Sequence, residues 1–165
     1  MSRTTIATWA AINLVAGLLL TFLAPTASGA IAIPISVGYP SAFGLMLALF
    51  SWRNRSTKPV ALFTLAGLSL FTGFACAGIP VNNPGDNFHQ VIAYWALGQA
   101  ALLLAARKFA GRHARDLFIV AVASALLGVA MFLPDFQLRD TLGFFSAYLL
   151  ITGVLLGIAA ATDQK

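Results

Sequence analysis

The sequence predicts an all-α membrane protein in which six membrane-crossing helices form three tandem helical hairpins with pseudo-threefold symmetry. Composition and an internal repeat both point to this fold class. Of the 165 residues, 59% are hydrophobic and only 9% are charged, whereas about a quarter of the residues of soluble domains are charged. We therefore expect lipid to cover most of the surface.

The repeat appears in residues that recur at a nearly constant step. Pro25 is followed by Pro80 and Pro134, which are steps of 55 and 54 residues. The chain has only three tyrosines, and they recur at the same two steps: Tyr39, Tyr94 and Tyr148. A fixed period of this kind indicates tandem copies of one supersecondary unit. We expect a single transmembrane domain with repeats at about 1–55, 56–109 and 110–165.

Six apolar segments approach the roughly 20 residues that a helix needs to cross the hydrocarbon core. Residues 4–52 carry no charge and divide at the turn Pro-Thr-Ala-Ser-Gly-Ala into segments 5–24 and 31–52. The other predicted helices cover residues 59–79, 91–106, 117–133 and 141–162. Pro34 fits a first helical turn, whereas Pro40 is expected to kink the second helix.

A second interpretation of the first segment stays open. Arg3, the apolar run and the small residues at 27–29 are also typical of a cleaved signal peptide. The length of the apolar run and its place in the repeat favour a membrane helix instead.

The distribution of charge predicts the orientation. In the predicted topology, nine of the ten Lys and Arg residues fall on one side of the membrane and Arg139 alone falls on the other. Basic loops stay in the cytoplasm, so both termini should be cytoplasmic. Four of the nine cations lie near one inner loop and are predicted to contact anionic lipid headgroups: Arg107, Lys108, Arg112 and Arg115.

Polar residues inside the apolar segments are candidates for a central site. Asn13 and Gln99 are the amides that lie deep in predicted helices, where polar groups usually face protein or a cavity. One hypothesis is that Tyr39, Tyr94 and Tyr148 converge on the axis and close or line an outer vestibule. The alternative is that the tyrosines are three copies of one packing residue.

The predicted outer loop, residues 81–90, carries Asp86 and His89. A histidine facing outward titrates as the external pH falls, which makes this loop a candidate pH sensor. A zinc site needs three or four protein ligands, so no metal site is predicted.

Two pairs of small residues are spaced as in membrane helices that pack closely. Ser124 pairs with Gly128, and Gly153 pairs with Gly157. Either pair suits a contact inside the chain or a face for a homo-oligomer.

No catalytic motif stands out in the sequence. A nucleophile with its base, a phosphate-binding glycine loop and a ligand cluster are all missing, so we predict no catalytic residue, no cofactor and no nucleic-acid partner. The predicted spans contain no Lys, Glu or Asp, which disfavours a proton-coupled transporter. The acidic outer loops keep a membrane-embedded enzyme open, and a passive pore along the axis is the other alternative.

The pattern of glycines, prolines and apolar residues resembles the HdeD-like acid-resistance membrane proteins. The matching residues are Gly17-Leu18-Leu19, Pro25, Ser28-Gly29, Gly38, Gly44 and Leu49-Phe50-Ser51, with echoes at 73–80 and 128–134. Pro40 and the polar loop at Asp86 depart from the pattern. The resemblance implies six spans in the bacterial cytoplasmic membrane and a non-enzymatic role in acid or envelope-stress tolerance through lipid or protein contacts.

Overall fold

The computed structural model describes residues 3–23, 25, 29–53, 60–78, 87–109, 111–132 and 137–162, and this part of the chain is helical without a strand. Its six α-helices are α1 (Arg3–Leu23), α2 (Gly29–Arg53), α3 (Val60–Ala77), α4 (Asn87–Ala106), α5 (Ala114–Ala130) and α6 (Leu138–Thr162). Two short 3-10 helices, η3 (Arg107–Phe109) and η4 (Gly111–His113), connect α4 to α5.

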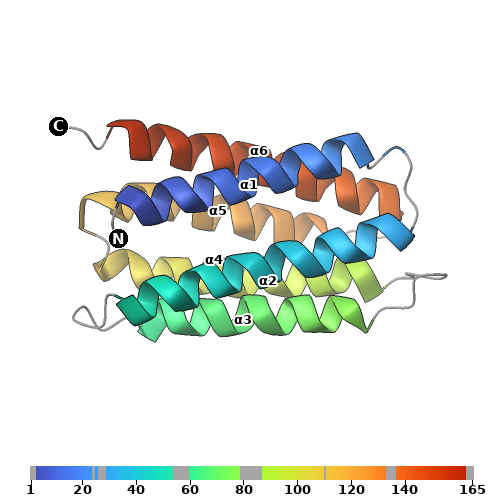
Figure 1. Ribbon diagram of the computed structural model, residues 1–165, viewed down its shortest axis with the longest axis horizontal. Helices are drawn as coiled ribbons and strands as arrows, with labels where there is room; N and C mark the ends of the chain where they lie inside the picture. Colours follow the sequence, from blue (N-terminus) through green and yellow to red (C-terminus); the bar gives the residue numbers. More distant parts are fainter. Residues whose placement is uncertain are drawn as a thin grey trace.

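The helices form one bundle and alternate in direction (Figure 1). As a result, α1 begins at the end of the bundle where α6 finishes. Each helix contacts its neighbours in the sequence, and α1 also packs along α6, so the six helices close into a ring. The most extensive packing joins α1 to α6, α2 to α3 and α4 to α5. Contacts between α1 and α2 and between α5 and α6 are much less extensive.

Each helix overlaps one predicted apolar segment, but α5 and α6 begin three residues earlier than predicted and α4 begins four residues earlier. The sequence pattern placed residues 81–90 in a loop, but α4 begins at Asn87 and includes His89. The side chain of Phe88 is buried, and this apolar contact explains why the helix extends into a polar stretch. Asp86 lies outside the described residues.

The outside of the bundle is apolar. All six helices expose large hydrophobic side chains, among them Phe22, Leu49, Phe74 and Leu126. Soluble proteins seldom expose contiguous apolar patches of this kind. Within the described residues, α1, α6 and residues Phe88–Ala106 of α4 are long and apolar enough to cross a membrane.

Glycines bring the tightly packed helices together. A Cβ atom on Gly153 of α6 would lie 2.8 Å from the Cγ of Leu14 in α1. A Cβ on Gly128 of α5 would lie 2.7 Å from the Cγ of Leu97 in α4. Ser124 is buried, and Gly157 faces Ala10 of α1. Gly128, Gly153 and Gly157 therefore make contacts inside the chain, as the first of the two expectations had it, and a homo-oligomer stays a prediction.

Candidate functional site

Three buried hydrogen bonds of one kind join neighbouring helices in the middle of the bundle. In each, a ring N–H or O–H of an even-numbered helix reaches a polar side chain of the preceding helix. The Tyr39 hydroxyl donates to Asn13 Oδ1 at 2.9 Å, and Trp95 Nε1 donates to Ser69 Oγ at 3.2 Å. The third bond, also 2.9 Å long, joins the hydroxyls of Tyr148 and Ser124. The partners are separated in sequence by 26, 26 and 24 residues.

The donor in the third bond follows from the number of hydrogens. Ser124 has a single hydroxyl hydrogen, which it donates to the carbonyl oxygen of Val120 at 2.8 Å. The Tyr148 hydroxyl is therefore the donor to Ser124. In all three bonds the aromatic residue donates and the polar residue accepts.

Asn13 extends one of these contacts to a third helix. Its Nδ2 donates to Thr152 Oγ1 of α6 at 2.8 Å, while its Oδ1 accepts from Tyr39 of α2. Thr152 in turn donates to the carbonyl oxygen of Tyr148 at 2.8 Å. Asn13 thus links α1, α2 and α6, and its side chain is fully buried.

Aromatic rings fill the space between these hydrogen bonds. The rings of Tyr39 and Trp95 are 5.8 Å apart between centroids and meet edge to face. Phe145 contacts both, at 5.6 Å from Tyr39 and 5.8 Å from Trp95, again edge to face. Edge-to-face pairs at such distances add to the stability gained from burial. The central aromatic cluster consists of Trp9, Tyr39, Phe43, Trp95, Phe145 and Tyr148.

Gln99 lies in the same region with its polar atoms unsatisfied. Its side chain is 0% exposed and its amide faces the Tyr148 hydroxyl. Neither the amide nitrogen nor the amide oxygen has a hydrogen-bond partner among the described residues. The two predicted buried amides are therefore both inside the bundle, but only Asn13 is satisfied.

Tyr94 does not join the other two tyrosines. Its side chain is 64% exposed, and its ring packs edge to face against Phe132 at 5.4 Å. Tyr39 and Tyr148 are 4% and 5% exposed. The prediction that three tyrosines converge is wrong because Trp95, one residue further along α4, takes the inward position. One residue turns a helix by about 100°, which carries Tyr94 to the outside.

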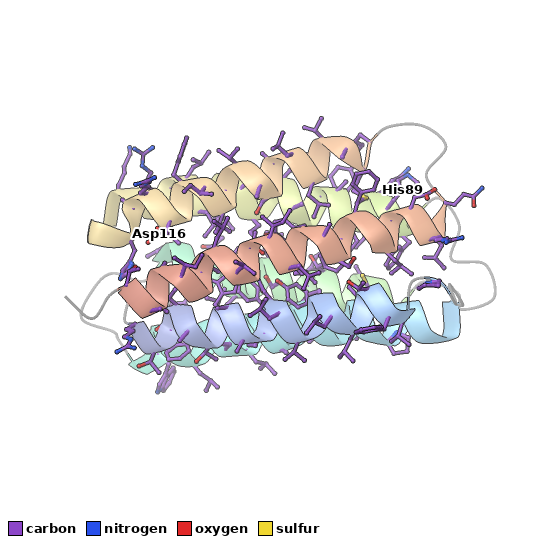
Figure 2. The ribbon with its side chains drawn as sticks, turned by 90° about the horizontal axis from the view of Figure 1, so that it is seen from above. His89 and Asp116 are labelled. Carbon is purple, nitrogen blue, oxygen red and sulfur yellow. The ribbon has the colours of Figure 1, made fainter. Side chains whose placement is uncertain are left out.

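The predicted pH-sensing and lipid-binding residues lie at opposite ends of the bundle. Figure 2 shows His89 at the end where α4 begins and Asp116 at the end where α5 begins. His89 is partly buried. Near Asp116, the side chains of Arg107, Lys108 and Arg115 are exposed; that of Arg112 lies outside the described residues.

Further contacts fix the basic end of the bundle. The Arg107 guanidinium lies 4.8 Å from the centroid of the Phe118 ring. His113 Nδ1 lies 3.3 Å from a carboxylate oxygen of Asp116. The Nε of Arg3 donates to the carbonyl oxygen of Ala160 at 3.0 Å, so α1 is held to the last turns of α6. The remaining N–H groups of Arg3 and Arg107 can still bind anions such as phosphate.

Two apolar grooves open between loosely packed helices. One, of about 460 Å³, lies between α1 and α2, with Tyr39 and Gly38 in its lining. The other, of about 600 Å³, lies between α5 and α6, with Tyr148 and Ala147 in its lining. A third cavity, of about 470 Å³, is lined mainly by the end of α1 and the start of α6 and includes Arg139.

Several residues of the central site were not predicted from the sequence. They are Trp9, Phe43, Ser69, Trp95, Phe145 and Thr152. Aligning the three repeats by their polar and small residues identifies some of these site residues. Asn13, Ser69 and Ser124 follow one another at steps of 56 and 55 residues, as do Gly17, Gly73 and Gly128. Aligning the repeats by the three tyrosines shifts the second repeat by one residue, because Trp95 and not Tyr94 takes the inward position.

The central site is suited to holding helices together and contains no group that titrates near neutral pH. Among the described residues, no three His, Cys, Asp or Glu side chains are grouped so as to hold a metal ion. Comparison of the chain with protein-family models, curated proteins and solved structures gives no match.

Proposed function

We propose that this chain is a multi-pass protein of the bacterial cytoplasmic membrane that supports tolerance of acid or envelope stress through contacts with lipid. In this proposal it neither conducts solutes nor carries out a reaction. The six helices are membrane spans arranged as three tandem hairpins, and both termini are cytoplasmic. The observation that carries the proposal is the packing of the bundle centre.

Two layers of buried side chains favour a bundle centre that is closed to solutes. The first is the central aromatic cluster, in which Tyr39, Trp95 and Tyr148 are each hydrogen-bonded to the preceding helix. Eight residues further along each of these helices, or about 12 Å by the helical rise, is a leucine that is 0% exposed. These leucines are Leu47, Leu103 and Leu156. A solute would have to displace both layers.

The repetition of contacts supports three copies of one hairpin. Each predicted hairpin contains one buried aromatic-to-polar hydrogen bond, with partners 26, 26 and 24 residues apart. The tight helix pairs, α2 with α3, α4 with α5 and α6 with α1, each join one hairpin to the next. A pseudo-threefold axis along the membrane normal accounts for both patterns.

The surface supports a role in lipid contact. Large apolar side chains are exposed on every helix, and two apolar grooves open on the outside of the bundle. Arg107, Lys108 and Arg115 at the opposite end from His89 are exposed and available to anionic headgroups, at about 1 kcal/mol for each charge.

Flux through proteoliposomes tests the proposal. Purified protein is reconstituted, and proton and small-solute flux are measured between about pH 4 and 7, which overlaps the range of about pH 5 to 8 in which an ordinary histidine changes its charge. We expect no flux above that of protein-free vesicles, for the wild type and for His89→Ala alike. Cells that lack the protein should survive acid challenge less well. Flux above the vesicle background, or unchanged survival, would overturn the proposal.

A passive pore is the second candidate, and Gln99 is the observation that favours it. A buried amide with no partner is costly, and water entering along the axis would satisfy it. If the axis hydrates, Gln99→Leu should lower a measured flux while leaving the fold intact.

A further inference from the structure

The cavity at the outer end of the bundle combines polar and apolar walls. Thr21 and Pro25 line one side of it, and Arg139, Asp140 and Ser146 line the other. Arg139 is the only Lys or Arg at this end of the bundle among the described residues. The cavity thus holds a cation and an anion that are adjacent in the sequence, together with two hydroxyls and apolar side chains.

The hydrogen bonds already formed in this cavity determine what it can still bind. The hydroxyls of Thr21 and Ser146 donate to the carbonyl oxygens of Gly17 and Gly143, at 2.8 and 2.9 Å. Each hydroxyl has one hydrogen, so toward a ligand it can only accept. The cavity therefore offers hydroxyl acceptors for a ligand that donates hydrogen bonds.

The two charged side chains further restrict which ligand the cavity can bind. One carboxylate oxygen of Asp140 accepts from the backbone N–H of Gln137 at 3.2 Å, and a carboxylate has lone pairs for further donors. The guanidinium of Arg139 carries five N–H donors in a geometry that matches phosphate. A ligand that fits both has a phosphate and, close to it, a cationic hydrogen-bond donor.

This cavity adjoins the apolar groove between α5 and α6. Phe144 and Ala147 line both of them. The groove, of about 600 Å³, has an almost wholly apolar lining. The similar groove between α1 and α2 has no charged residue in its lining.

We propose that the cavity and the groove together bind one phospholipid with a primary ammonium headgroup, of the phosphoethanolamine class. The phosphate lies on Arg139, the ammonium donates to Asp140 and to the two hydroxyls, and an acyl chain occupies the groove between α5 and α6. A phosphoglycerol headgroup lacks the cation that Asp140 needs, and a phosphocholine headgroup has no N–H to donate. The site rests on the proposed function, because it assumes that this end of the bundle lies at a membrane surface.

Native mass spectrometry of the detergent-solubilised protein tests this site. The protein is mixed with equal amounts of phosphatidylethanolamine, phosphatidylglycerol and phosphatidylcholine that carry the same acyl chains. We expect the first lipid to be retained at least about fivefold more than phosphatidylglycerol, a factor equivalent to one interfacial charge contact. It should also be retained more than phosphatidylcholine, whose ammonium cannot donate a hydrogen bond. Retention that does not depend on the headgroup would overturn the proposal.

Three substitutions test whether the lipid binds at this site. Asp140→Asn keeps an acceptor for the Gln137 N–H but loses the charge, so the preference over phosphatidylglycerol, which has no cation in its headgroup, should fall. Arg139→Gln should weaken retention of all three lipids. Gly143→Leu should block the cavity, because a Cβ atom there meets no other atom within 4 Å and the side chain can extend into the cavity without disturbing the helix.

Gly67→Leu is the matched control, because Gly67 of α3 also has open space around its Cβ position and lies outside this cavity. It should retain lipid as the wild type does. If Asp140→Asn and Gly143→Leu bind as the wild type does, the site is wrong. That result leaves the proposed function standing, since flux and acid survival are measured separately. Flux above background would refute the proposed function without changing the retention result.

Discussion

Two buried amides at the centre of the bundle differ in what they contribute. Asn13 uses both ends of its amide, accepting from Tyr39 and donating to Thr152, and so connects three helices. Gln99 is equally buried, and neither end of its amide is hydrogen-bonded within the part of the chain that the structure describes. Residues of the same chemistry at similar depth should therefore respond in opposite ways to an apolar substitution.

Asn13→Leu should destabilise the protein by about 1 to 2 kcal/mol, because it removes two interhelical hydrogen bonds and leaves the Tyr39 hydroxyl buried without an acceptor. Gln99→Leu is the matched comparison and should be neutral or stabilising, since a group with no partner is removed. Thermal unfolding in detergent measures both. Equal losses of stability in the two variants would show that Gln99 is as well paired as Asn13.

The sequence predicted which residues are deep in the helices, but not which face of each helix points into the bundle. The depth of Asn13, Gln99, Tyr39 and Tyr148 followed from their positions inside apolar runs. Which face of α4 points inward did not, because α4 is apolar on all sides and its pattern does not mark an inner face. The chance spacing of Tyr94 then favoured the wrong residue over Trp95.

At the level of the helices, close packing depends on glycines. A Cβ atom on Gly44 of α2 would lie 2.9 Å from the carbonyl oxygen of Ala66 and 2.8 Å from the Cγ of Leu70, both in α3. The oxygen belongs to the backbone of a packed helix and cannot move aside alone. In lipid no hydrophobic force draws helices together, so their association depends on such close contacts.

Gly44→Ala should destabilise the protein by about 1 to 3 kcal/mol, the usual cost of overpacking. Gly67→Ala should leave stability unchanged or raise it by up to about 1 kcal/mol, because alanine favours the helix and its Cβ meets nothing. Unfolding midpoints of the two variants, measured in the same detergent, check this difference. A harmless Gly44→Ala would mean that α2 and α3 pack less tightly than described.

The helices themselves were predictable because each one lies in a long apolar run of the sequence. The positions at which the helices begin and end were harder to predict. His89 was placed in a loop on the polarity of its neighbours, whereas burial of Phe88 extends α4 to Asn87. The small-residue pairs at Ser124 and Gly153 were recognised, but only the fold shows that their partners are inside the chain.

At the scale of the whole molecule, the tight interfaces do not coincide with the sequence hairpins. The most extensive packing joins α2 to α3, α4 to α5 and α6 to α1. The turns within hairpins lead instead to loosely packed pairs, and two of these pairs carry the apolar grooves. The order of the helices in the sequence does not show which pairs pack most tightly. The contact between α1 and α6, for example, joins the first helix of the chain to the last.

Labelling of single cysteines with a membrane-impermeant maleimide tests the six-span arrangement most directly. Each cysteine replaces one exposed residue at a helix end, in a chain that lacks its native cysteine, and intact cells are compared with permeabilised ones. Cysteines at Gly78 and Gln137 should react in intact cells, whereas those at Thr4, Lys108 and Thr162 should react only after permeabilisation. Reaction of the Lys108 and Gln137 sites from the same side, or of the Thr4 and Thr162 sites from different sides, would contradict three parallel hairpins.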